Sequence, residues 1–117
     1  MRSHLVLLIA LGACTTSDRL VPATGGDPAA GKRTIEAYGC QACHAIPNIR
    51  RFGGQVGPPL DHIATRAYIG GELPNTPRNL VLWLYDPHSV EKHTAMPTLG
   101  LSKKEARDVA AYLYTLD

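Results

Sequence analysis

The sequence predicts an all-α fold for one small domain, because three segments carry helix start signals in order along the chain. The first signal is an Asp-Pro pair at residues 27–28, and the second is a Thr-Pro pair at 76–77. The third is a capping box at 102–105, in which Ser and Glu side chains satisfy free amide groups at a helix start. We therefore expect three helices that are joined by loops.

The first 13 residues are typical of an export signal peptide. A short positive segment, Met1 to His4, precedes an apolar run from Leu5 to Gly12 that is too short to span a bilayer. The run ends in Leu-Gly-Ala-Cys, which resembles the lipoprotein box of bacteria, where the cysteine becomes the lipidated first residue. We expect a lipid anchor at Cys14, on the periplasmic side of a bacterial membrane. The alternative is a plain secretory signal, which leaves Cys14 as an odd thiol in an oxidising compartment.

Residues 14–30 are predicted to form a flexible tether, because they are rich in Thr, Pro, Gly and Ala and lack periodicity. About sixteen flexible residues have a root-mean-square reach of roughly 20–25 Å, enough for a domain to move above a membrane surface. The folded domain is predicted over residues 31–117, which is 87 residues. At that size an apolar core alone gives only marginal stability, and a buried cofactor would add hydrophobic contact.

The first helix is expected to stop at Gly39 and to lead into a C-x-x-C-H motif, Cys40-Gln41-Ala42-Cys43-His44. Two residues between the cysteines match the separation of the two vinyl groups of a haem, so both thiols can form thioethers. The imidazole that follows then lies close to the iron. The motif predicts one covalent haem c, attached through Cys40 and Cys43, with His44 as an axial ligand.

Two other sites use a C-x-x-C pair. A zinc site needs a second pair of Cys or His ligands at short spacing, and the remaining thiol, Cys14, lies far upstream. A thioredoxin-like redox pair expects a preceding strand in a βαβ pattern, whereas a helical segment runs into this motif. Haem attachment therefore explains the motif better.

The second axial ligand is predicted to be Met96. It is the one methionine after the signal region, and it lies in a Pro- and Gly-bounded loop at 94–100 without helical periodicity. His/Met ligation is a standard arrangement for a c-type haem. Two alternatives stay open: Met96 fills a gap in the core, or His88 or His93 is the ligand in a bis-His site.

The remaining two helices are expected from residue 77 to the Asp-Pro pair at 86–87, and after the capping box. The apolar stripe of the second helix consists of Leu80, Trp83 and Leu84 at i, i+3 and i+4. The apolar face of the last helix consists of Val109, Tyr112, Leu113 and Leu116. Lys104 and Asp108 can form an i, i+4 ion pair on this helix.

From Gly31 to the C-terminus the sequence resembles the small monohaem class I cytochromes c. The shared features are the helix that ends at the C-x-x-C-H motif, a Gly-Pro-x-Leu segment at 57–60, and the interval from residue 87 to Met96. The resemblance implies an all-α class I cytochrome c fold, with helices wrapped around one covalently bound haem. It also implies that the last helix crosses the first near Ile35, with small residues such as Ala111 permitting close approach.

The same resemblance implies roles for four more residues around the haem. The carbonyl of Pro58 would accept a hydrogen bond from the His44 imidazole and so tune the iron ligand. Leu60 would pack on the haem, and Trp83 would form the pocket wall on the methionine side. Arg66 would pair with a haem propionate, and a solvated surface arginine is the alternative.

A narrower resemblance covers residues 39–80. The segments Gly-Cys-x-x-Cys-His-x-Ile-Pro, Gly-x-Val-Gly-Pro-x-Leu-x-His-Ile and Gly-x-Leu-Pro-Asn-Thr-Pro-x-Asn-Leu are similar to the cytochrome domain fused to subunit II of some bacterial haem-copper oxidases. Those fused proteins carry a copper-binding domain and transmembrane helices ahead of the cytochrome. We expect this chain to be a free-standing relative that has neither.

Charge and ligation limit the function. The formal net charge of +2 falls by one when Arg2 leaves with the signal, which is too weak a field to attract nucleic acid. The basic residues near the motif, which form either a docking patch or a solvated face, are Lys32, Arg33, Arg50 and Arg51. With His44 and Met96 on both axial positions, the iron has no open place for a substrate.

We therefore expect an electron carrier and not an enzyme. It would be tethered on the periplasmic side of the membrane, take electrons from an upstream donor and pass them to a terminal oxidase of the haem-copper type. One alternative is an electron-accepting cytochrome subunit of a periplasmic dehydrogenase complex. Another is a haem sensor in which Met96 leaves the iron to admit a gas.

Overall fold

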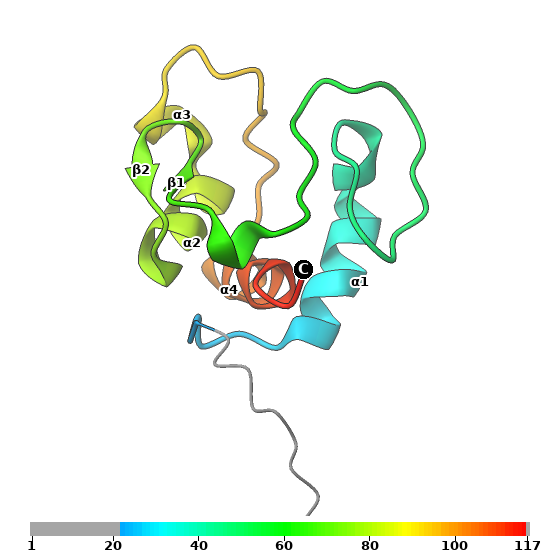
Figure 1. Cartoon of the computed structure of the whole chain (residues 1–117), viewed down its shortest axis with the longest axis horizontal. Coiled ribbons are helices and arrows are strands. Elements are labelled where there is room, and N and C mark those ends of the chain that lie inside the picture. Colours follow the sequence, from blue (N-terminus) through cyan, green and yellow to red (C-terminus); the bar gives the residue numbers. More distant parts are fainter. Residues whose placement is uncertain (1–21, 117) are drawn as a thin grey trace, which may run out of the picture.

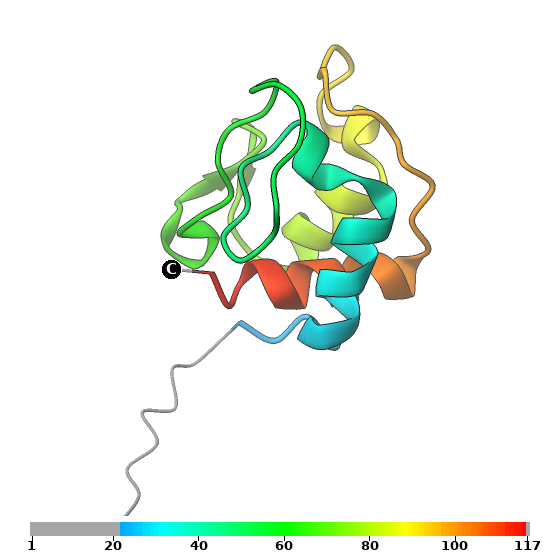
Figure 2. The ribbon, with the colours of Figure 1, turned by 90° about the vertical axis from the view of Figure 1, so that its right-hand side faces the viewer.

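Three longer helices form the frame of the structure: α1 (Pro28–Tyr38), α2 (Pro77–Tyr85) and α4 (Lys103–Leu113). In this computed structural model, which describes residues 22–116, α1 and α2 both pack against α4, which lies between them (Figure 1). Two long loops, residues 43–62 and 91–102, lie on the same side of α4 in both views (Figures 1 and 2). The helical architecture confirms the predicted all-α class.

Each long helix begins where the sequence signals it. The Asp27 carboxylate accepts a hydrogen bond from the N–H two residues further on (2.9 Å), and the Thr76 hydroxyl accepts one from the N–H three residues further on (3.2 Å). Ser102 and Glu105 make both hydrogen bonds of the predicted capping box, at 3.1 and 2.8 Å. Gly39 ends α1 at φ 75°, a left-handed conformation that glycine adopts without strain.

Several short elements were not predicted. Asp86 ends α2, as expected, but it also caps a four-residue helix, α3 (Pro87–Val90), by accepting a hydrogen bond from an N–H of that helix. Strands β1 (Tyr68–Ile69) and β2 (Leu73–Pro74) pair antiparallel around a three-residue turn that contains Gly70 and Gly71. Single 3₁₀ turns, η1 (Cys40–Ala42) and η2 (Ile63–Thr65), lie before and after the first long loop.

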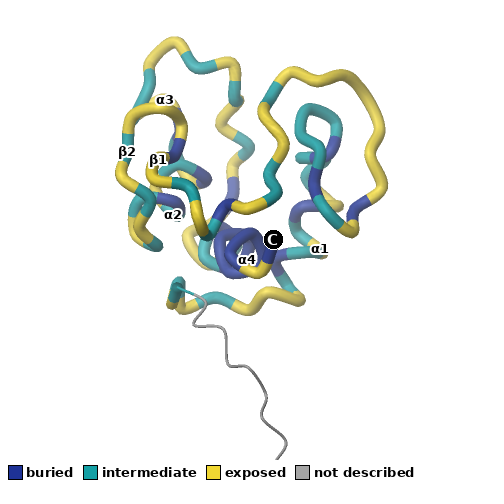
Figure 3. Tube along the Cα trace, viewed as in Figure 1, coloured by how far each residue is buried: buried dark blue, intermediate teal, exposed yellow. Residues whose placement is uncertain are grey.

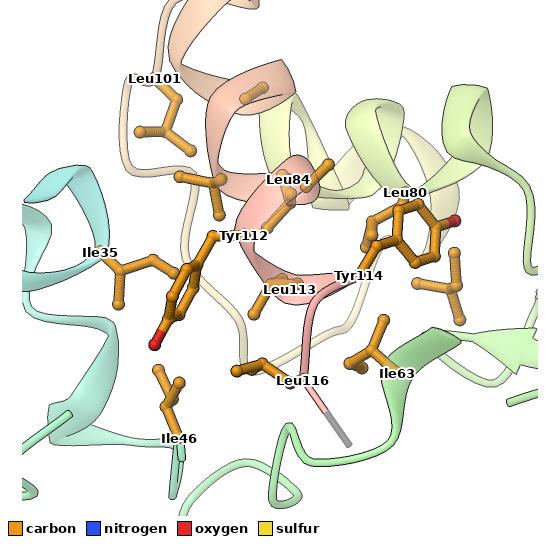
Figure 4. Packing of buried hydrophobic residues seen from close by; sticks show 14 of the residues in the cluster. Ile35, Ile46, Ile63, Leu80, Leu84, Leu101, Tyr112, Leu113, Tyr114 and Leu116 are labelled. Carbon is orange, nitrogen blue, oxygen red and sulfur yellow. The ribbon is translucent and has the colours of Figure 1, made fainter. Parts of the chain in front are cut away.

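The core gathers around α4, where seven of the eleven residues are buried, including all six from Asp108 to Leu113 (Figure 3). Side chains of α1, α2 and α4 meet there, together with isoleucines from the loops (Figure 4). The predicted apolar face of the last helix is confirmed, although α4 ends at Leu113 and Leu116 reaches the core from beyond it, only 3% exposed. The core residues of the predicted helices include Ile35, Leu80, Leu84, Val109, Tyr112 and Leu113.

Helices α1 and α4 cross with their backbones in contact at Gly31. A Cβ atom at this position would lie 1.9 Å from the carbonyl oxygen of Asp108, so only glycine permits the approach. Ala111, the small residue expected at this crossing, is buried on α4 as well. The requirement for glycine on the α1 side was not predicted.

Residues 24–27 are bound to α4. The Thr24 hydroxyl donates a hydrogen bond to the Arg107 carbonyl (3.0 Å), and the Asp27 N–H donates one to the Asp108 carboxylate (2.8 Å). Lys104 binds the other oxygen of that carboxylate at 2.7 Å, which is the predicted i, i+4 pair. We call residues 24–27 the strap, and they lie on the side of α4 opposite to the long loops (Figures 1 and 2).

The strap and the first turn of α1 therefore belong to the hydrogen-bonded structure, although the sequence places residues 24–30 in the tether. Cys14 and the signal region lie outside the described residues. Within residues 22–116, no helix has the length and apolar character needed to cross a membrane.

Candidate functional site

A cavity of about 500 Å³ lies between the long loops and the core, a volume typical of a ligand site. Its floor comes from α4 through Val109 and Leu113, and its sides come from η1, the loops and α2. Apolar side chains make up most of the wall. The cavity gathers all eight residues predicted to surround the cofactor: Cys40, Cys43, His44, Pro58, Leu60, Arg66, Trp83 and Met96.

The two thiols are presented by η1. After the left-handed turn at Gly39, the N–H groups of Cys43 and His44 both donate to the Cys40 carbonyl, at 3.2 and 3.0 Å. This tight turn brings both cysteines and the histidine to the cavity wall. Burial raises the pKa of the Cys40 thiol, and the nearby Cys43 raises it further against the lowering effect of a backbone hydrogen bond. Both cysteines are half-buried and free.

The His44 imidazole is held in one orientation by the loop segment 57–60. Its Nδ1 lies 2.7 Å from the Pro58 carbonyl oxygen. A carbonyl can only accept, so Nδ1 carries the hydrogen. In the neutral imidazole Nε2 then keeps a free lone pair, the form needed for a metal ligand. The hydrogen bond expected between Pro58 and His44 is therefore present in the structure.

Gly57 makes room for this imidazole. A Cβ atom at Gly57 would lie 2.2 Å from Cε1, 2.6 Å from Nδ1 and 2.8 Å from Nε2 of His44. The loop is also fixed to the motif by backbone hydrogen bonds, from Gly57 N–H to the Cys43 carbonyl (3.0 Å) and from Leu60 N–H to the Ala45 carbonyl (2.8 Å). The segment 57–60 thus covers the ring and orients it.

Met96 brings a thioether sulfur to the cavity, in addition to the two thiols. It is half-buried in the segment 94–97, where its N–H donates to the Thr94 hydroxyl (3.2 Å). His88 and His93 are exposed and do not line the cavity. His88 instead lies 3.2 Å from the Thr98 hydroxyl. Met96 therefore lines the same cavity as His44, and the two other histidines do not.

Arg66 and Trp83 both line the cavity and both have additional contacts. The Arg66 guanidinium donates hydrogen bonds to the Pro59 carbonyl and, at 2.8 Å, to the Asp61 carbonyl. The Trp83 ring lies against the β1–β2 turn, where a Cβ atom at Gly70 would lie 2.7 Å from the indole. Asn75, which also lines the cavity, was not predicted, although its position directly before the helix cap at residue 76 marks it as a loop residue.

The donor set at this cavity fits a covalent haem c. It offers two free thiols at C-x-x-C-H spacing, an imidazole with an available nitrogen, and a thioether, in a wall that is mostly apolar. The wall residues include Ile35, Ile46, Leu60, Leu80, Leu84 and Leu99. Such a wall suits a large flat apolar group and excludes water from it.

Known proteins resemble the chain over this region. A family model described as cytochrome c matches residues 28–117. Cytochrome c oxidase subunit 2 of Alkalihalophilus pseudofirmus is 31% identical over 74% of this chain and 25% of that protein. Cytochrome c-552 of Bradyrhizobium diazoefficiens is 29% identical over 99% of this chain and 98% of that protein. The chain thus spans about a quarter of the oxidase subunit and nearly all of the cytochrome c-552.

Proposed function

Since the chain belongs to the cytochrome c family, whose members bind covalent haem c, we propose that it carries single electrons to a haem-copper terminal oxidase while anchored through Cys14 to the periplasmic side of a bacterial membrane. The observation that carries the proposal is the meeting of two thiols, an imidazole and a thioether on one cavity wall. Family membership also decides against the zinc and thioredoxin-like alternatives for the motif.

Each of these side chains has one task in the proposal. Cys40 and Cys43 would hold the haem through thioether bonds, and His44 and Met96 would supply an imidazole and a thioether ligand to its iron. When bound, the haem supplies a one-electron couple at its iron. The Pro58 carbonyl keeps the hydrogen on Nδ1 of His44, which leaves Nε2 for the iron and raises the basicity of the ring.

The proposed ligands and the apolar cavity wall both favour electron transfer over binding of a substrate. With an imidazole and a thioether both as ligands, the iron would have no coordination position left for a small molecule. The apolar wall penalises the extra positive charge of the oxidised centre, and a soft thioether donor does the same. Both effects raise the midpoint potential, which suits delivery of electrons to an oxidase.

The proposed partner is supported by the similarity to a protein named cytochrome c oxidase subunit 2. In a fused protein, covalent linkage supplies proximity, and a lipid anchor with a short tether supplies it by confining both partners to one surface. The net charge, +2 for the full chain and one less without Arg2, is small and agrees with proximity in place of long-range attraction. Turnover by the anchored protein should therefore depend only weakly on ionic strength.

The test is oxygen uptake by the oxidase in vesicles, with the lipidated protein and with a Cys14→Ala form as electron donor. We expect the lipidated protein to support faster uptake at equal bulk concentration, and mass spectrometry to find acyl chains on Cys14. Equal rates for the two forms would refute the role of the anchor. Transfer to no oxidase, with rapid reduction by a dehydrogenase, would instead assign the chain to a dehydrogenase complex.

A further inference from the structure

Both the oxygen and the nitrogen of the Asn75 side-chain amide make hydrogen bonds at the edge of the cavity. Its Oδ1 accepts a hydrogen bond from the Tyr114 hydroxyl at 2.7 Å. Its Nδ2 donates to the carbonyls of Ile63 (2.6 Å) and Arg66 (2.8 Å). With one acceptor and two donors satisfied, the amide has one possible orientation. Tyr114, only 3% exposed, joins this amide to the C-terminal end of α4.

The segment that Asn75 holds also carries the acceptor for His44. At its far end, the Arg66 guanidinium closes the turn by donating to the Pro59 and Asp61 carbonyls. At its near end, the Pro58 carbonyl accepts from Nδ1 of His44 at 2.7 Å. A continuous set of hydrogen bonds therefore runs from Tyr114 through Asn75 and residues 58–66 to the imidazole.

We propose that Asn75, oriented by Tyr114, is a positioning residue for His44: it fixes segment 58–66 and so sets the strength of the Pro58–His44 hydrogen bond. The inference rests on the proposed function in one respect, the ligation of iron by His44. A strong hydrogen bond from Nδ1–H makes the imidazole a better electron donor to the iron, which stabilises the ferric state. A looser segment 58–66 weakens this hydrogen bond and so destabilises the ferric state. The midpoint potential then rises.

Three variants test this inference on the haem-loaded protein. Tyr114→Phe removes one hydroxyl, and Asn75→Ala removes the whole amide. Tyr112→Phe is the matched control, because the Tyr112 hydroxyl of the same helix also donates to a loop carbonyl, that of Pro47 (3.1 Å), on a segment Asn75 does not touch. All three lose one or more partly buried hydrogen bonds, so a general loss of stability affects the control as well.

Two measurements are made on each variant: the midpoint potential, and the solvent exchange rate of the His44 Nδ1 proton in the reduced protein by NMR. We expect both Tyr114→Phe and Asn75→Ala to speed this exchange and to favour reduction about threefold, which is about 28 mV at 59 mV per tenfold. Tyr112→Phe should change neither quantity.

Unchanged exchange and potential in Asn75→Ala, or equal changes in Tyr112→Phe, would overturn the inference. If the wild-type protein lacks the weak near-infrared sulfur-to-iron band, the proposed His/Met ligation fails. The exchange of the His44 proton still reports in that case whether Asn75 holds the ring, so the two failures are distinguishable.

Discussion

Gly57→Ala tests directly whether the loop orients the proximal imidazole. The added Cβ would lie 2.2 Å from Cε1 of His44, and ordinary contact begins at 3.4 Å, so the ring or the loop must move by more than an ångström. The φ angle of Gly57 is not positive, so alanine brings no backbone strain of its own. The effect of the substitution therefore falls on the imidazole and on its 2.7 Å hydrogen bond to Pro58.

The expected cost combines two effects. Overpacking costs about 1–3 kcal/mol, and the weakened hydrogen bond costs about 1 kcal/mol, so we expect a free energy of unfolding lower by about 2–4 kcal/mol. For a domain of this size the midpoint of thermal unfolding then falls by about 10–30 °C. Thermal denaturation followed by circular dichroism measures the loss, and the optical spectrum and potential report on the iron ligand.

Gly54→Ala is the control for this substitution. It lies three residues earlier in the same loop, has no positive φ, and a Cβ atom there would meet nothing within 4 Å. We expect it to be neutral or to stabilise by up to about 1 kcal/mol, because alanine restricts the unfolded chain. If Gly57→Ala unfolds at the same temperature as Gly54→Ala and keeps the same spectrum, the loop does not constrain the ring.

Three further predictions follow from other parts of the structure. Met96→Ala should abolish the sulfur-to-iron band, lower the midpoint potential and allow carbon monoxide to bind the reduced protein; a band that survives would assign the ligand to another residue. Asp108→Asn should lower the free energy of unfolding by about 1–3 kcal/mol at pH 7, since the carboxylate accepts from the strap and from Lys104. Burial raises the pKa of Asp108, but these hydrogen bonds and the charges of Lys104 and Arg107 outweigh it and lower the pKa overall. The stabilisation is therefore present above the unfolded value of about 3.9 and is lost as pH falls through the lower folded value, so a difference between variant and wild type that is unchanged in acid would contradict this account. Gly31→Ala should destabilise the protein despite the better helix propensity of alanine, because the contact with the Asp108 backbone costs more than the roughly 1 kcal/mol gained; chemical denaturation with an unchanged midpoint would show that the helices can separate without loss.

Local chemistry made most of the helices and half of the site predictable. Caps such as Ser102 and stops such as Gly39 act within one turn of chain, so their signals are complete in a short segment. The same is true of C-x-x-C-H, where three side chains meet within a single turn. The contact of Pro58 with His44 spans 14 residues, and it was predicted only through resemblance to a family.

The features that were missed depend on contacts between distant segments. Asn75 meets a tyrosine 39 residues away, and the strap meets α4 more than 80 residues away. Nothing in the local sequence specifies such partners. A partial signal existed at Gly31, because a glycine inside a helical segment often marks close approach of another backbone.

The crossing of α1 with α4 joins the two ends of the domain, and this sets the order of events when the protein is made. A chain is synthesised from its N-terminus, so α1 and the adjacent Cys40 and Cys43 exist well before α4. Until α4 arrives, Gly31 and Ile35 have no surface to pack against, and a helix of 11 residues is only marginally stable alone. Both thiols therefore remain accessible during this interval, before the loops and α4 enclose the wall on which they lie. A chain in which α4 has not yet packed thus presents both thiols openly to the cofactor.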